Sequence, residues 1–202
     1  MIKTVIFDLG RVIVPFDFHR AYARVEALGG APASEIPALL APTGLFQQFE
    51  TGSIQPADFA ERIFELLNFR VPYAEFCDIW TSIFLPRTLV SDELVSALGR
   101  NHRLVLLSNT NRIHFDMIRE NYPILNHFDQ FVLSHEVGAM KPDPAIYAAA
   151  VAAARCEPSE CFFTDDIPDY VEGARRSGID AVQFQNETQL RQELAARGVR
   201  TD

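Results

Sequence analysis

The sequence predicts an α/β protein with a doubly wound parallel sheet and an inserted subdomain of α-helices. Three observations support this fold class. Short apolar runs end in polar residues, helical patterns lie between the later runs, and a long helical stretch separates the first run from the second. Strands that alternate with helices favour a parallel sheet with right-handed crossovers.

Five apolar runs are expected to form the strands of this sheet. They are short and rich in Val, Leu and Phe, as is typical of strands that are buried on both faces. The runs are Val5–Asp8, Leu104–Thr110, Phe131–His135, Cys161–Asp166 and, more weakly, Ala181–Phe184.

Two helices between the later strands have clear start and stop signals. Pro144 follows Asp143, a good N-cap residue, and the apolar residues after it keep helical spacing. Pro168 begins a second helix, and Gly178 is its expected stop. Both segments therefore fit the crossovers that a parallel sheet needs.

Residues 16–87 are predicted to be a helical cap, bracketed by Pro15 and Pro86, while residues 1–15 and 88–202 form the core. Three apolar sets each fall on one helix face, and we expect them to pack helix against helix rather than to line a pocket. The sets are Phe18, Tyr22 and Val25; Phe59, Ile63, Leu66 and Leu67; and Phe76, Ile79, Trp80, Ile83 and Phe84.

Composition argues against several classes of protein. The chain has 202 residues, a net charge of −9 and no cluster of Lys and Arg, which argues against nucleic-acid binding. Three cysteines without a C-x-x-C pair argue against a disulfide framework or a zinc site, and for a reducing compartment. No apolar stretch approaches the ~20 residues that span a bilayer. We expect a cytoplasmic protein with no membrane partner, and the oligomeric state stays open.

The polar residues at the strand ends form the candidate site. In a doubly wound sheet, ligands bind outside the carboxyl ends of the strands. The candidates are Asp8; Ser108, Asn109 and Thr110; Lys141, in the loop after the third run; and Asp165 and Asp166. Each alone fits a turn or a helix cap, but the whole set in this order is improbable by chance.

This set of side chains suits phosphoryl transfer. Carboxylates at a strand end can hold Mg²⁺, which prefers oxygen ligands. Mg²⁺ and Lys141 would neutralise phosphoryl oxygens, and Ser108 and Asn109 can donate hydrogen bonds to the same oxygens. Asp8 can then attack phosphorus and form an aspartyl-phosphate.

The order of the motifs strongly resembles the haloacid dehalogenase (HAD) superfamily. "VIFDLG" resembles its first motif, "LVLLSN" its second, "MKPDPAIY" its third and "FFTDDIPDYVEGA" its fourth, and the helical insertion resembles its small cap. Within the superfamily, "FDLGRVIVPFDFHR", "FQQFETGSI" and "LLSNTNR" most resemble the alpha-D-glucose-1-phosphate phosphatase subgroup.

The resemblance implies a Rossmann-like core and assigns roles to the candidate residues. Asp8 would be the nucleophile, with Ser108 and Lys141 as its catalytic partners. The metal ligands would be Asp8, the carbonyl of Gly10 and Asp166, with Asp165 further from the ion. The residues expected beside the substrate are Leu9, Gly10, Asn109 and Glu50.

Two positions depart from the family pattern. Most phosphatases of the superfamily carry a second Asp two residues after the nucleophile, as general acid and base, and this chain has Gly10. Such help is typically worth ~10²–10⁴-fold in rate. Either the leaving group is good, as an anomeric hydroxyl would be, or water or a cap residue donates the proton. A glycine also allows backbone with φ above zero. Tyr170 stands where the fourth motif commonly has Asn or Asp.

The segment "FETGSI", Phe49–Ile54, is a candidate specificity loop in the cap. Glu50 could bond sugar hydroxyls there, and an ordinary helix-turn-helix joint is the alternative. If the proton comes from elsewhere than position 10, then Asp17, His19 and Glu50 are the first candidates.

The function predicted by these observations is a Mg²⁺-dependent phosphatase acting on a small phosphorylated metabolite, such as glucose 1-phosphate. Two alternatives remain. A metal-independent 2-haloacid dehalogenase would use Asp8 to attack carbon, but Asp165 and Asp166 would repel its substrate carboxylate. A catalytically weak domain that binds a phosphorylated ligand or a partner would explain Gly10.

Overall fold

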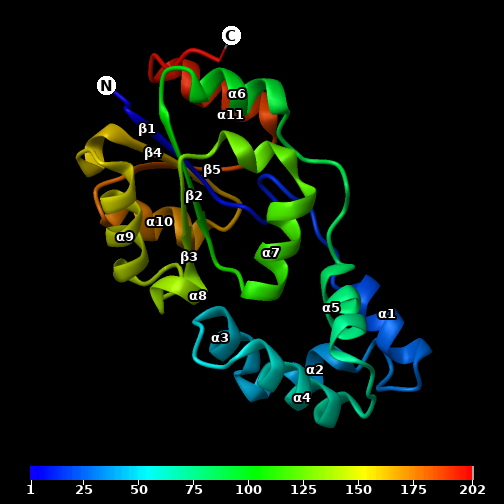
Figure 1. Ribbon diagram of the computed structural model, residues 1–202. Coiled ribbons are helices and arrows are strands. Elements are labelled where there is room, and N and C mark those ends of the chain that lie inside the picture. The colour runs from blue at the N-terminus through cyan, green and yellow to red at the C-terminus, as the bar shows by residue number, and fades with distance from the viewer. Residues whose placement is uncertain (202) are drawn as a thin grey trace.

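The computed structural model describes residues 1–201, and its centre is a five-stranded, all-parallel sheet of order β3-β2-β1-β4-β5 (Figure 1). In β1, Val5 pairs with Leu104 of β2 and with Phe162 of β4, so β1 is the middle strand. The predicted doubly wound parallel sheet is confirmed. The strands are β1 (Thr4–Phe7), β2 (Arg103–Ser108), β3 (Gln130–Leu133), β4 (Cys161–Asp165) and β5 (Asp180–Gln183).

The strands end earlier than the apolar runs predicted. Asn109 and Thr110 leave the sheet after β2, and Ser134 begins the short helix α8 (Ser134–Val137). The reason is a local exchange of hydrogen bonds. The Thr110 amide donates to Ser134 Oγ at 2.9 Å, and Ser134 Oγ donates to the Thr110 carbonyl at 3.0 Å. These backbone groups therefore bond a side chain instead of a neighbouring strand.

Helices cover both faces of the sheet. Val5, Leu104 and Phe162 point to the face covered by α6, α7 and α11, whereas Ile6 and Phe163 point to the face covered by α9 and α10. Alternate residues of a strand point to opposite faces, which is why continuously apolar strands suit a sheet buried on both sides. The helices are α6 (Asp92–Gly99), α7 (Arg112–Asn121), α9 (Pro144–Ala154), α10 (Pro168–Arg176) and α11 (Glu187–Ala196), with 3-10 turns at Pro123–His127 and Pro158–Glu160.

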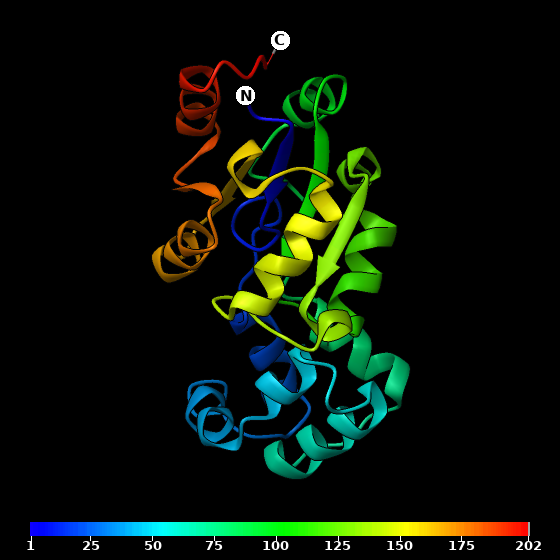
Figure 2. The same ribbon diagram turned by 90° about the vertical axis from the view of Figure 1, so that its left-hand side faces the viewer.

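The remaining helices lie beyond the carboxyl ends of the strands, away from both termini (Figures 1 and 2). These cap helices have a hydrophobic cluster of their own, in which Phe49 stacks on Phe59 and Phe76 stacks on Trp80. They are α1 (His19–Ala27), α2 (Ile36–Leu40), α3 (Leu45–Glu50), α4 (Pro56–Leu67) and α5 (Tyr73–Thr81), with a 3-10 turn at Ala41–Thr43. The exact division of the chain at residues 16–87 remains a prediction.

Two paired chain segments join the cap helices to the sheet. The Asp17 amide donates to the Ile83 carbonyl, and the Leu85 amide donates to the Pro15 carbonyl, each at 2.9 Å. Ile83 and Phe84 were expected on the face of the third cap helix, but α5 ends at Thr81. Ile83 instead lies in a turn, and Phe84 forms an isolated antiparallel bridge with Phe16 of the segment that enters the cap. No helix within residues 1–201 has the length and apolarity needed to cross a membrane.

Candidate active site

Asp8 and Lys141 form the centre of the candidate site, at the carboxyl end of the middle strand. The Asp8 amide continues the sheet by donating to the Thr164 carbonyl at 3.0 Å, which aims its side chain out of the strand end. Lys141 Nζ donates to Asp8 Oδ1 and to Asp165 Oδ2, both at 2.6 Å, and to the Leu107 carbonyl at 3.2 Å. All three ammonium protons are therefore used, and the Lys141 side chain is 1% exposed.

Asn109 holds the Lys141 loop in place. The Lys141 amide donates to Asn109 Oδ1 at 2.8 Å, and Asn109 Nδ2 donates to the Lys141 carbonyl at 3.1 Å and to the Tyr170 hydroxyl at 3.3 Å. The sequence predicted Asn109 beside the substrate, whereas in this structure both ends of its amide bond the protein. Among the described residues, Ser108 Oγ makes a single long contact, 3.4 Å, to the Asn109 carbonyl. Ser108 is therefore the freer of the two donors.

Burial and charge shift the titration of this cluster. Burial raises the pKa of Asp8, Asp165 raises it further, and Lys141 acts in the opposite direction. Burial alone would lower the pKa of Lys141, but the two carboxylates outweigh it and raise the pKa above its usual value. The pKa of Asp166 is raised by burial and by Asp165. For both Asp8 and Asp166, burial is the larger cause and the neighbouring Asp165 carboxylate adds to it.

The carboxylates fit a divalent cation. Asp8, Asp165 and Asp166 each offer an oxygen, and these oxygens lie within 4.8 Å of one another. With Lys141 included, the ionised cluster carries two more negative than positive charges, which a divalent ion would neutralise. An all-oxygen set of this kind suits Mg²⁺.

The hydrogen bonds distinguish the two aspartates after β4. Asp165 is occupied at both oxygens, because Oδ2 bonds Lys141 and Oδ1 accepts the Ile167 amide at 2.9 Å. The half-buried carboxylate of Asp166 bonds no other residue within the described chain, 1–201. The carbonyl of Gly10 likewise accepts no hydrogen bond there. Asp8, Asp166 and the Gly10 carbonyl are therefore the groups most available to an ion.

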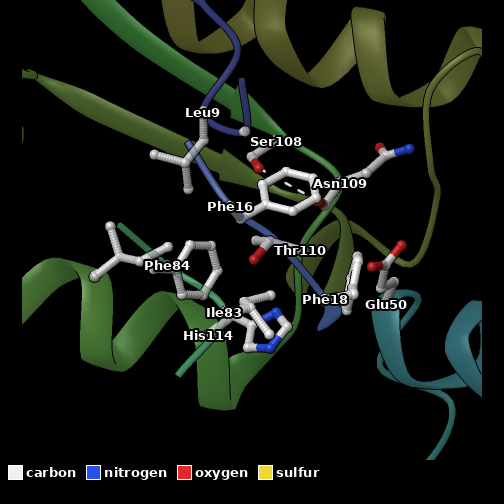
Figure 3. A pocket seen from close by; sticks show the side chains of 12 residues that line it. Leu9, Phe16, Phe18, Glu50, Ile83, Phe84, Ser108, Asn109, Thr110 and His114 are labelled. Atoms are coloured by element: carbon white, nitrogen blue, oxygen red, sulfur yellow. Dashed lines mark hydrogen bonds between the residues drawn. The ribbon is translucent and has the colours of Figure 1, made fainter. Parts of the chain in front are cut away.

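A cavity of about 70 Å³ lies between the strand ends and the cap helices (Figure 3). Leu9, Gly10, Ser108, Asn109 and Thr110 line it from the core side. Phe16, Phe18, Glu50, Ile83 and Phe84 line it from the segments of the cap. Three of the apolar residues expected only to pack helix on helix, Phe18, Ile83 and Phe84, thus also line the cavity.

Gly10 is explained by close packing and not by its backbone angle. The residue with positive φ in this turn is Arg11, at 57°, so a positive φ is not what requires a glycine at position 10. A Cβ on Gly10 would lie 2.8 Å from Phe16 Cε1. The Phe16 ring, with the Arg11 guanidinium 5.0 Å from its centroid, fills the space that a side chain at position 10 would need.

His114 is a structural residue that joins α7 to the cap helices. Its ring nitrogens contact Asn111 Nδ2 at 3.0 Å and the Trp80 carbonyl at 3.2 Å, and burial lowers its pKa to about 4. No sequence motif pointed to this role, since its partner Trp80 is 34 residues away. His19, a candidate proton source from the sequence, is exposed on α1 and is not among the residues that line the cavity.

A buried aspartate at the end of the middle parallel strand, bonded to a lysine from a later loop and opposite a helical cap, defines a HAD-type hydrolase. The haloacid dehalogenase-like hydrolase family matches residues 2–178, and the chain belongs to this family. The superfamily predicted from the motifs is confirmed, and the chain is a hydrolase of this class.

Known proteins similar to this chain include two phosphatases. D-ribitol-5-phosphate phosphatase of Bacteroides thetaiotaomicron is 28% identical over 200 residues, which cover 96% of this chain and 97% of the relative. Phosphatase MT3486 of Mycobacterium tuberculosis is 26% identical, and the aligned region covers 94% of this chain and 90% of that protein.

Solved structures show the same similarity. A HAD family enzyme of Bacteroides thetaiotaomicron, in complex with magnesium and inorganic phosphate, superposes with a TM-score of 0.84 at 29% identity, covering 92% of this chain and 96% of its own. A 2-haloacid dehalogenase of Pseudomonas syringae has a TM-score of 0.69 at 20% identity, covering 98% of this chain and 100% of its own, and shares the fold alone. The choice between phosphorus and carbon chemistry therefore depends on the site.

Proposed function

We propose that the protein is a Mg²⁺-dependent phosphatase that hydrolyses a small phosphomonoester through an aspartyl-phosphate on Asp8. The observation that carries this proposal is the division of roles between the paired aspartates. Asp165 is bonded to Lys141 and to a backbone amide, whereas the carboxylate of Asp166 is left beside that of Asp8. A dehalogenase would have no use for this uncompensated negative charge.

Each residue of the cluster has a part in the proposed reaction. Asp8 attacks phosphorus, and Lys141 holds the Asp8 carboxylate in position and offsets its charge. Ser108 donates a hydrogen bond to a phosphoryl oxygen. Asp8, Asp166 and the Gly10 carbonyl would hold Mg²⁺, with Asp165 further away, and the bound ion would neutralise the phosphoryl oxygens.

The size of the cavity favours a small substrate. About 70 Å³ is far below the ~300–1,000 Å³ of pockets that enclose drug-sized ligands. Glucose 1-phosphate, from the resemblance in sequence, and D-ribitol 5-phosphate, from the relative of that name, are the first substrates to test.

A phosphate-release screen over a panel of phosphomonoesters, with and without Mg²⁺, tests the proposal. We expect Mg²⁺-dependent release that chelator abolishes. Halide release from a 2-haloacid without metal would establish the dehalogenase instead. No release from any ester, with phosphate or phosphorylated ligands still bound, would establish the binding domain.

Asp166→Asn and Asp165→Asn form a matched pair for the metal assignment. Asp166→Asn should raise the Mg²⁺ concentration needed for half-maximal activity at least tenfold with little change in thermal stability. Asp165→Asn should lower thermal stability, because it disturbs the buried contact with Lys141. The reverse pattern would contradict the assignment.

A further inference from the structure

We propose that Glu50 of the cap is the general acid and base of the reaction, in place of the aspartate that Gly10 lacks. This inference rests on the proposed phosphatase function and deepens it. A general acid at this site must be a titratable side chain in the cavity, and its titrating group must have no other bonding partner. It must also come from a residue other than the one at position 10.

Glu50 is placed in the cavity by α3. It is the last residue of that helix, and its side chain points from the helix end into the space beneath the strand ends (Figure 3). Helix α3 packs against α8, and Gly52 follows in close contact with the His135 carbonyl. These contacts hold the end of α3 against the cavity that Gly10 and Ser108 line from the core side.

The titrating group of Glu50 is free, whereas that of His114, which also lines the cavity, is occupied. His114 uses both ring nitrogens in contacts with Asn111 and Trp80. Within residues 1–201, no hydrogen bond or ion pair occupies the Glu50 carboxyl group. Of the other candidates from the sequence, Asp17 and His19 are exposed, and the Asp17 carboxylate accepts the His19 amide.

The surroundings of Glu50 favour a proton shuttle near neutral pH. Burial raises the pKa of Glu50 to about 7, while Lys141 acts to lower it. Tyr170 also faces Glu50, and its own pKa is raised by burial. The nearby helices α4 and α8 also carry titratable side chains, and these bond other groups. Arg62 of α4 donates to the Gln48 side chain at 3.4 Å, and His135 of α8 contacts the Thr110 carbonyl. An acid with a pKa near the working pH is the most effective in both directions.

The proton balance of the two steps requires one group that gives and then takes a proton. As Asp8 forms its bond to phosphorus and the P–O bond to the leaving group breaks, the Glu50 carboxyl gives its proton to the leaving oxygen. Water then attacks the aspartyl-phosphate, its proton passes to the Glu50 carboxylate, and phosphate and the free Asp8 carboxylate are released. No further reactant is needed.

Leaving-group dependence under single-turnover conditions tests this role. The substrates are 4-nitrophenyl phosphate, phenyl phosphate and an alkyl phosphate, in order of poorer leaving group. Glu50→Gln should slow transfer from the alkyl ester by ~10²–10⁴-fold and from 4-nitrophenyl phosphate far less. The fall of the wild-type alkyl rate as pH rises through about 7 should also disappear. Glu65→Gln, exposed on α4, is the control and should match wild type.

The outcomes separate this inference from the function on which it rests. If Glu50→Gln slows all three esters by one factor, Glu50 only binds or positions the substrate, and the inference fails. If Glu50→Gln leaves the series unchanged while Tyr170→Phe steepens it, Tyr170 is the proton donor. If wild type releases no phosphate from any ester, the proposed phosphatase function itself fails.

Discussion

Gly52 is the point at which the cap loop touches the core, and Gly52→Ala should separate the two. Its φ is +68°, and a Cβ there would lie 2.2 Å from the His135 carbonyl oxygen. Cβ atoms essentially never approach closer than 3.0 Å, so the loop must withdraw by at least about 0.8 Å. Because the Cβ position is fixed by the backbone and the contacted oxygen is a backbone carbonyl, no side-chain rotation can relieve the overlap.

Two effects of this substitution can be given magnitudes. An L-residue in the left-handed region costs roughly 1–2 kcal/mol, which lowers the free energy of unfolding. Withdrawal of the loop also moves Glu50, two residues earlier, away from the strand ends. A misplacement of about 1 Å can cost ~10²-fold in rate, so we expect kcat/KM to fall by about that factor.

Gly29→Ala is the matched control for this experiment. Gly29 also belongs to the cap segment and has a φ of +81°, but no atom of residues 1–201 outside its own neighbours lies within 4 Å of the position that a Cβ would take there. It should therefore show the stability loss without the loss of activity. The assays are thermal unfolding and initial rates with 4-nitrophenyl phosphate. Equal kcat/KM values for the two variants would refute the role of the Gly52 contact in positioning the cap.

Three further substitutions test the core of the site. Asp8→Asn should abolish phosphate release with an unchanged circular dichroism spectrum, and substantial residual turnover would contradict a covalent mechanism. Lys141→Met leaves two buried carboxylates without their ammonium group, so urea unfolding should show a loss of ~3–5 kcal/mol, and a loss below about 1 kcal/mol would contradict the geometry. The folded-state pKa of His114 is depressed to about 4, so its contribution to stability is present above about pH 6.5 and is lost as pH falls towards 4. Protonation of His114 can lower the free energy of unfolding by about 3 kcal/mol at most over this pH range. Urea unfolding of His114→Phe should lack this part of the pH dependence.

Local pattern was enough to predict the sheet and to place most of the residues of the candidate site at one edge of it. Apolar runs bounded by polar residues mark parallel strands, and the carboxyl ends of such strands meet at one edge. Asp8, Ser108 and Asp166 could therefore be placed together from the sequence. Proline signals likewise located the starts of α9 and α10, because the fixed φ of proline acts locally on the backbone.

Long-range contacts decided what those residues touch. The extent of β2 depends on Ser134, which is 24 residues from Thr110 and bonds its backbone. Two other contacts join segments that are far apart in the chain. Asn109 bonds the Lys141 loop, and Gly52 lies close to the His135 carbonyl. No period or motif encodes such pairs, because they form only when the cap helices and the sheet pack against each other. The environment of Glu50 arises in the same way: its burial depends on the cap loop resting on the core, and so does the pKa that suits it to proton transfer.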